Sequence, residues 1–199
     1  MKYFKYGEKE IEHLKEKDLI LGEAIDEFGM IKRPVELDLF TSLIYSIIGQ
    51  QISNKAASTV KGRFLELVGE VTPEAIQELS VQEIQACGMS MRKADYIKGI
   101  AEAALDGTVD FAKLNELSDK EVIEQLTQLK GVGIWTAEML LLHSLHRADI
   151  VSYNDLAIRR GMKRLYNLDE LSKKEFDLYK EKYTPYGSTA SLYLWEISK

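Results

Sequence analysis

The stretch from Leu129 to Asp155, LKGVGIWTAEMLLLHSLHRADIVSYND, decides how the rest of the sequence is interpreted. It contains a glycine turn, Gly131-Val132-Gly133, and then an apolar segment expected to form a helix that begins near Ile134 or Trp135. Glycine adopts backbone angles closed to other residues and leaves no side chain over a turn. Successive N–H groups can then point outward at the start of the next helix and bind a phosphate oxygen. The stretch therefore predicts an anion-binding turn.

Helices are expected on both sides of this turn. Only three prolines occur, and Leu, Glu, Lys, Ala and Ile are abundant. Apolar residues at helical spacing predict longer helices at 8–28, 36–49 (from Glu36), 54–67, 91–105, 156–166 and 188–197. The first of these has the expected core positions Ile11, Leu14, Leu19, Leu21, Ile25 and Phe28. No strand pair, repeat or low-complexity segment is indicated, so the sequence predicts an all-α fold.

Several helix starts are marked by local hydrogen-bonding patterns. Ser80-x-x-Glu83, Ser118-x-x-Glu121 and Ser172-x-x-Glu175 are capping boxes, in which the serine and the glutamate each bond the other's backbone N–H. Ser53 is an expected N-cap. Pro73 stands at the favoured first position of a short helix.

The length, composition and charge exclude several classes of protein. At 199 residues the chain can form one large domain or two small lobes, and no apolar run is long enough to span a bilayer. The charged N-terminus lacks the apolar core of a secretory signal, and the single Cys87 excludes an internal disulfide, so we expect a cytoplasmic protein. One cysteine also excludes a four-cysteine iron–sulfur cluster. The formal net charge of −6 argues against indiscriminate coating of nucleic acid, but not against local binding.

The central stretch resembles the helix–hairpin–helix motif of the DNA glycosylase superfamily, L-x-G-[VI]-G-x-x-T-A followed by an essential aspartate. The matching residues are Leu129, Gly131, Val132, Gly133, Thr136, Ala137 and, downstream, Asp155. Trp135-Thr136-Ala137 is similar to the alkylation-repair branch, whereas branches that cleave the strand carry a lysine at the position of Trp135. The resemblance covers about residues 39–195.

The resemblance implies an architecture of two helical lobes with an active-site cleft between them. A central lobe, residues 34–148, would contain the helix–hairpin–helix. Residues 1–33 and 149–199 would form the second lobe from both chain ends. The implied partner is double-stranded DNA containing a damaged base, with no membrane and no cofactor, and we expect a monomer.

DNA contacts are implied in two places. In the hairpin they fall on Lys130, the turn Gly131-Val132-Gly133 and Thr136. The segment Gly49-Gln50-Gln51-Ile52-Ser53 resembles the loop that probes the duplex, and there Gln51 would fill the gap left by an extruded nucleotide. Gln50 and Ser53 would lie near the backbone of the damaged strand. The alternative is that the two glutamines satisfy loop backbone groups, because buried amides need partners.

Basic residues follow Asp155 closely. The cluster consists of Arg159, Arg160, Lys163 and Arg164, and Arg159 is the predicted DNA contact among them. A solvated helix face is the alternative explanation, since runs of charge commonly form one.

Asp155 is the candidate catalytic residue. On local sequence alone it is a favoured helix N-cap that would bond the backbone between Leu156 and Ile158. The hairpin upstream favours catalysis instead. The implied reaction is hydrolysis of the bond between a damaged purine and deoxyribose, in which a carboxylate stabilises the positive charge on the sugar and can activate water. An alkylated purine is already cationic and needs little acid assistance, so one carboxylate suffices.

An extruded cationic base needs a pocket with aromatic faces. By resemblance these are Trp135 and Trp195, the only two tryptophans. Tyr186 is a further candidate, although a packing role at a subdomain boundary is favoured for it. Met139 stands where a relative has a tyrosine, which makes this pocket less aromatic.

A catalytic metal is not expected. His143 and His146 could share a helix face but have no third ligand nearby, so zinc is disfavoured. In relatives, hairpin carbonyls hold a potassium or sodium ion with a structural role, and the resemblance extends this to the carbonyls of Leu129 and Val132. Two other functions stay open: a non-catalytic helix–hairpin–helix DNA-binding protein and a helical protein–protein adaptor.

Overall fold

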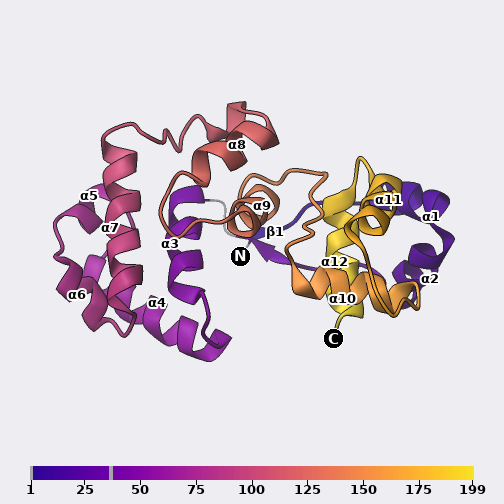
Figure 1. Cartoon of the computed structure of the whole chain (residues 1–199), viewed down its shortest axis with the longest axis horizontal. Coiled ribbons are helices and arrows are strands. Elements are labelled where there is room, and N and C mark those ends of the chain that lie inside the picture. Colours follow the sequence, from indigo (N-terminus) through magenta and orange to yellow (C-terminus); the bar gives the residue numbers. More distant parts are fainter. Residues whose placement is uncertain (1, 36–37) are drawn as a thin grey trace. The chain divides into compact units, whose positions relative to one another are not determined.

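The computed structural model describes residues 2–35 and 38–199 and divides the chain into two compact units (Figure 1). The first is formed by Met1–Glu36 with Leu141–Lys199, and the second by Leu37–Leu140. The described residues form twelve α-helices, one short 3-10 helix and one pair of two-residue strands. The predicted all-α class is therefore confirmed. No helix in the described ranges has the length and apolar character needed to cross a membrane.

The second unit consists of helices packed around α7. Its elements are α3 (Leu39–Gly49), α4 (Asn54–Val68), α5 (Pro73–Gln77), α6 (Val81–Ala86), α7 (Met91–Leu105), η1 (Leu114–Glu116), α8 (Asp119–Leu126) and most of α9 (Ile134–His143). Helices α3, α5 and α6 all contact α7. Four side chains of α3 are fully buried, at Leu43, Ile44, Ile47 and Ile48. Helix α3 is therefore central in this unit, as its nearly continuous apolar stripe predicts.

The predicted helix starts are confirmed where the pattern is local. Ser80, Ser118 and Ser172 each form the complete capping box with the glutamate three residues later. Ser53 caps α4 by accepting a hydrogen bond from the Ala56 N–H at 3.2 Å. Helix α3 was predicted from Glu36, which lies outside the described residues, as does Leu37. The described part of this helix begins at Leu39, after the N-cap Asp38.

The first unit is built around α12. Its elements are β1 (Lys2–Tyr3), α1 (Glu8–Lys17), α2 (Leu19–Phe28), β2 (Pro34–Val35), α10 (Leu156–Leu165), α11 (Lys173–Tyr183) and α12 (Gly187–Ile197). Every residue from Gly187 to Trp195 is buried. Helices α1, α2, α10 and α11 all contact α12, and α10 lies closest along it. A Cβ added to Gly161 of α10 would lie 2.0 Å from the carbonyl oxygen of Leu194, so only glycine permits this approach.

The single helix predicted at residues 8–28 is wrong: the structure has two helices that meet at Asp18. Asp18 is extended (φ −146°) and caps α2 by accepting from the Leu21 N–H at 3.0 Å. Its other carboxylate oxygen accepts from the Tyr166 hydroxyl at 2.8 Å. The break changes the helical phase, so the expected core residues Leu19 and Phe28 are exposed instead, Leu19 to 76%.

The sequence predicted no strand pair, and the structure contains a short one. β1 runs antiparallel to β2, with Lys2 opposite Val35 and Tyr3 opposite Pro34. Two-residue strands are too short to produce an alternating pattern, so apolar periodicity does not indicate them. The pairing continues in the hydrogen bond from the Phe4 N–H to the Arg33 carbonyl at 2.9 Å.

Candidate active-site and DNA-binding residues

The glycine turn joins α8 to α9 in the second unit. Gly131 has φ +88°, a left-handed conformation that favours glycine, and the Val132 N–H donates to the Leu129 carbonyl at 3.1 Å. The ring of Tyr96 packs directly on Gly131, where an added Cβ would lie 2.3 Å from it. Helix α9 begins at Ile134, as predicted. Glycine is thus required at position 131 for two independent reasons.

Gly133 does not have the backbone conformation that was expected of a turn glycine. Its φ is not left-handed, and an added Cβ would meet no atom within 4 Å. No constraint inside the described structure therefore explains a glycine at this exposed position. Lys130 is also exposed, whereas the side chains of Val132 and Thr136 are buried. A DNA contact by either of these two would have to involve the backbone.

The loop between α3 and α4 lies beside this turn. Gln50 Nε2 donates to the Gly131 carbonyl at 2.9 Å, so the structure brings together two of the predicted DNA-binding residues. The Gln50 amide thereby satisfies a backbone group of the hairpin, so the alternative explanation holds for Gln50 only in that its amide pairs with backbone. Gln51 is exposed and has φ +58°, which is uncommon for a residue with a side chain. Ile52 and Ser53 next to it are also exposed.

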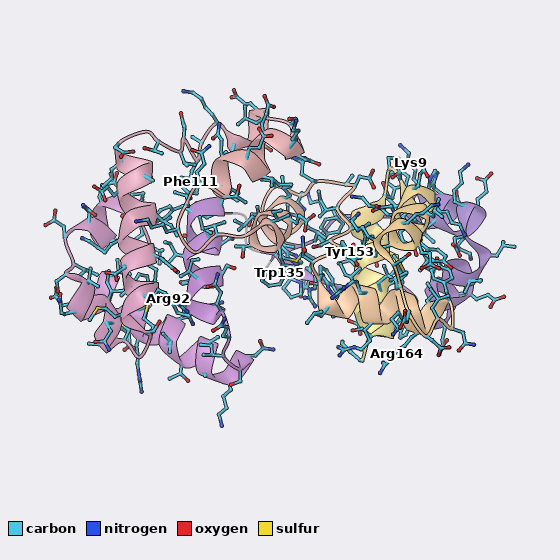
Figure 2. All side chains as sticks on the ribbon, viewed as in Figure 1. Lys9, Arg92, Phe111, Trp135, Tyr153 and Arg164 are labelled. Carbon is cyan, nitrogen blue, oxygen red and sulfur yellow. The ribbon has the colours of Figure 1, made fainter. Side chains whose placement is uncertain are left out.

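A hollow of about 510 Å³ opens between this loop, the start of α7 and the turn. The lining residues are Gln50, Gln51, Ile52, Gly88, Met89, Ser90, Arg92, Lys93, Tyr96 and Gly131. Arg92, labelled in Figure 2 at the start of α7, extends from the helix with its side chain exposed. Sequence reasoning missed Arg92, Lys93 and Tyr96, because nothing in their local pattern distinguishes them from other residues of an amphipathic helix.

Asp155 is the N-cap of α10 in the first unit. Its Oδ1 accepts from the N–H groups of Ala157 and Ile158, both at 2.9 Å, and the residue is only 7% exposed. The capping role expected from local sequence is thus confirmed. It is compatible with catalysis, because the bonds fix the carboxylate and the helix N-terminus stabilises negative charge.

The segment before Asp155 is held against the start of α12. Ser188 Oγ accepts from the Ile150 N–H at 2.9 Å, and Ser191 Oγ donates to the Ile150 carbonyl at 2.8 Å. The Asp149 carboxylate accepts from the Gly187 N–H at 3.0 Å. These bonds anchor Asp149 and Ile150 to α12, while the Asp155 carboxylate itself is held by its bonds to Ala157 and Ile158.

Trp195 is 9% exposed and is covered by two residues that sequence reasoning did not connect with it. The His143 ring stacks on it at 5.4 Å between centroids, and the Arg33 guanidinium lies 5.1 Å from the ring centroid. Burial lowers the pKa of His143 to about 4, with smaller contributions from Arg33 and His146, while nearby Asp155 acts in the opposite direction. The imidazole next to Trp195 is therefore neutral near pH 7. His146 instead stacks on Phe4 at 5.6 Å.

Comparison with known proteins identifies the family. Residues 44–185 match the model described as "HhH-GPD superfamily base excision DNA repair protein". The chain belongs to this superfamily. It is 39% identical to DNA-3-methyladenine glycosylase 1 of Schizosaccharomyces pombe over 80% of this chain and 72% of that protein.

Solved structures of superfamily members agree with this assignment. The crystal structure of DNA-3-methyladenine glycosidase from Bacillus halodurans has a TM-score of 0.89 and 37% identity, over 100% of this chain and 93% of that one. A 3-methyladenine DNA glycosylase of Schizosaccharomyces pombe in complex with abasic DNA has a TM-score of 0.83 and 35% identity, over 95% and 96%. The HhH-GPD fold is thus reproduced over nearly the whole chain.

The other pocket residues predicted for this HhH-GPD protein lie in different surroundings. Trp135 is 40% exposed in the first turn of α9, where Figure 2 labels it, and Met139 is half-buried on the same helix. Tyr186 packs on α1, with its ring edge-on to His13 at 5.1 Å. These contacts favour the packing role for Tyr186.

The basic cluster of the HhH-GPD chain lies along α10. Arg159, Arg160, Lys163 and Arg164 are among the residues that line a hollow of about 820 Å³. The Arg159 guanidinium lies 5.0 Å from the centroid of the Tyr153 ring. Asp169, Glu170 and Glu175 also line this hollow, so its charge is mixed. The contact of Arg159 with DNA stays a prediction.

The monovalent ion implied for the hairpin also stays a prediction. The Leu129 carbonyl accepts one hydrogen bond, from Val132, and each carbonyl oxygen has a second lone pair that an ion could use. The Leu129 carbonyl therefore keeps the capacity to accept a further contact from such an ion. Among residues 2–35 and 38–199 no group of three or more His, Cys, Asp or Glu side chains could hold a metal.

The neutral state of His143 makes folding depend on pH. The unfolded chain binds a proton at this histidine near its ordinary pKa of 6.5, whereas the folded protein binds it only near 4. Between these values the unfolded state holds more protons, so the free energy of unfolding falls as the pH falls from about 6.5 to about 4. This histidine should account for about 3 kcal/mol of the loss. Urea unfolding of the wild type and His143→Phe at several pH values measures it; identical pH profiles would contradict the assignment.

Proposed function

We propose that this protein is a monofunctional DNA glycosylase that excises alkylated purines, of the 3-methyladenine and 7-methylguanine type, by hydrolysing the N-glycosidic bond. The observation that carries the proposal is Asp155: a buried carboxylate held by two backbone N–H groups, in a chain with the superfamily hairpin. The names of the similar proteins support the substrate class. In the non-catalytic DNA-binding alternative the same two hydrogen bonds only cap α10, and release of free base distinguishes the two functions.

The chemistry follows from the charge that develops on the sugar. As the base departs, positive charge accumulates on the deoxyribose ring, and the Asp155 carboxylate stabilises it. Because Asp155 is already oriented by Ala157 and Ile158, no reorganisation is required when the charge appears. The same carboxylate aligns the attacking water and accepts its proton. A cationic alkylated purine leaves without a second acid.

DNA binding uses the glycine turn at Gly131 and the loop that carries Gln51, both in the second unit. The Gly131 turn presents backbone N–H groups to a phosphate, and the open space in front of Gly133 allows the DNA backbone to approach closely. Extruding the damaged nucleotide costs a few kcal/mol. Gln51, exposed at the tip of its loop, fills the emptied position and offsets part of this cost. The exposed face of Trp135 attracts the cationic base.

The test is release of free base. Purified protein is incubated with methylated DNA, and free 3-methyladenine and 7-methylguanine are measured by chromatography. Release above that of a no-enzyme control supports the proposal, whereas binding without release favours the non-catalytic alternative. Duplexes that each contain one defined lesion, including hypoxanthine and ethenoadenine, then establish the substrate range.

A further prediction concerns the DNA product. Because Trp135 stands where strand-cleaving branches carry a lysine, no amine is expected at that position to attack the sugar and form a Schiff base. The product should be an intact strand with an abasic site. Borohydride reduction during the reaction should trap no covalent protein–DNA adduct, and a trapped adduct on gel electrophoresis would refute the monofunctional mechanism.

A further inference from the structure

Lys93 connects α7 to the end of α3. Its Nζ donates to the carbonyl of Ile48 at 2.8 Å and to that of Gln50 at 2.6 Å. The last carbonyl groups of a helix have no partner within it, and the helix dipole favours a positive charge there. Burial lowers the pKa of Lys93, in agreement with an ammonium group partly removed from solvent. Lys93 thus holds the last turn of α3 and Gln50, the residue directly before Gln51.

Gln50 extends this connection to the hairpin. The residue accepts the Lys93 bond on its backbone carbonyl, and its side-chain amide donates to the Gly131 carbonyl at 2.9 Å. Tyr96, also on α7, packs its ring on the same glycine. One helix therefore supports both the loop and the turn within this unit.

Gln51 needs such support because of its backbone. With φ +58°, it adopts the left-handed conformation, which is unfavourable for a residue with a side chain. Strained conformations of this kind persist when surrounding contacts hold them, and they are concentrated at functional sites. The bonds of Lys93 hold the residue directly before Gln51.

We propose that Lys93 is a positioning residue: it holds the Gln51 loop in its left-handed conformation and in register with the Gly131 turn, so that loop and turn meet the damaged strand as one preformed surface. This inference rests on the proposed function, since Gln51 is taken to enter the duplex. Preorganisation strengthens binding by removing the cost of ordering the loop during association.

Lys98 provides a matched control on the same helix. Its Nζ donates to the carbonyls of Gln77 at 2.8 Å and Leu79 at 2.7 Å, at the end of α5. Lys98 thus makes the same kind of hydrogen bonds as Lys93, but at the end of a helix that adjoins neither the Gln51 loop nor the hairpin. Lys93→Met and Lys98→Met should destabilise the fold to a similar extent, but only Lys93→Met should change DNA binding.

The first measurement uses the free protein. Amide hydrogen exchange of the hydrogen-bonded N–H groups in the last turn of α3 and at Gln50 should become at least about tenfold faster in Lys93→Met, because opening of this segment no longer has to break the Lys93 bonds. Lys98→Met should leave these amides unchanged, and Lys93→Arg, which keeps the charge and the donors, should restore slow exchange. Unchanged exchange in Lys93→Met would overturn the inference without reference to DNA.

The second measurement is a double-mutant cycle on a duplex containing a tetrahydrofuran abasic-site analogue. Lys93→Met should weaken binding about tenfold, the equivalent of losing a hydrogen-bonded charge. If Lys93 acts through Gln51, the same substitution in a Gln51→Ala protein should weaken binding no more than about twofold further. Additive losses, or wild-type binding by Lys93→Met, would refute the positioning role. Lys93→Gln replaces Lys93→Met if the latter does not fold.

The two hypotheses fail in different ways. A wild-type protein that binds the abasic duplex no better than undamaged duplex contradicts the proposed function, whatever the exchange rates. If the wild-type protein prefers the abasic duplex, and this preference is lost in Gln51→Ala but kept in Lys93→Met, the proposed function stands. Only the positioning role of Lys93 is then removed.

Discussion

Asp155→Asn is expected to fold normally and to lose nearly all base excision. Asparagine is as good an N-cap as aspartate, and its side-chain oxygen can still accept from Ala157 and Ile158. It carries no negative charge for the developing oxocarbenium ion. Losing one preorganised electrostatic stabiliser lowers the rate by a factor of about 100 to 1,000, and by more if water activation is also lost. Single-turnover release of base from a methylated duplex measures the effect.

Asp38→Asn is the matched control for this experiment. Asp38 caps α3 by accepting from the Thr41 N–H at 2.6 Å, so the substitution makes the same chemical change at another helix start. It should leave both thermal stability and excision almost unchanged. Asp155→Asn should also unfold near the wild-type temperature and still bind abasic DNA. Full excision by a stable Asp155→Asn protein would end the catalytic interpretation.

Gly161→Ala is expected to produce the largest loss of stability among the glycine-to-alanine substitutions in this chain, because its added Cβ would lie nearest to a backbone atom. The new Cβ would lie 2.0 Å from the Leu194 carbonyl oxygen and 2.8 Å from its carbonyl carbon. Both atoms belong to the backbone of α12, so no side-chain rotation can relieve the overlap, and α10 and α12 must separate. Overpacking costs about 1–3 kcal/mol where side chains can adjust, and we expect about 3 kcal/mol or more here. Urea unfolding measures the loss.

Gly62→Ala is the corresponding control. Gly62 lies inside α4 on an exposed face, and an added Cβ would meet nothing within 4 Å. Alanine is the better helix former, so this variant should gain about 0.5–1 kcal/mol. Excision should fall in Gly161→Ala, because α10 carries Asp155, and remain unchanged in Gly62→Ala. Equal stabilities of the two variants would contradict the observed approach of α10 to α12.

The sequence alone determined the features whose causes are local. The capping boxes at Ser80, Ser118 and Ser172 each involve residues within one helical turn, so their bonds form wherever the pattern occurs. The start of α9 after the glycine turn and the cap at Asp155 are local in the same sense. The all-α class followed from apolar periodicity, which also acts over a few turns.

Only the tertiary structure decided the features made by residues far apart in the chain. Asp18 interrupts the predicted first helix and bonds Tyr166, and the periodicity around it shows neither the break nor the partner. Gly161 is indistinguishable from Gly62 in sequence, yet only Gly161 faces another backbone. No local pattern indicates the hydrogen bond between Gln50 and Gly131 either, because the two residues lie far apart in the chain. Long-range packing creates these constraints, and a local pattern contains no information about which distant group will occupy the space beside a residue.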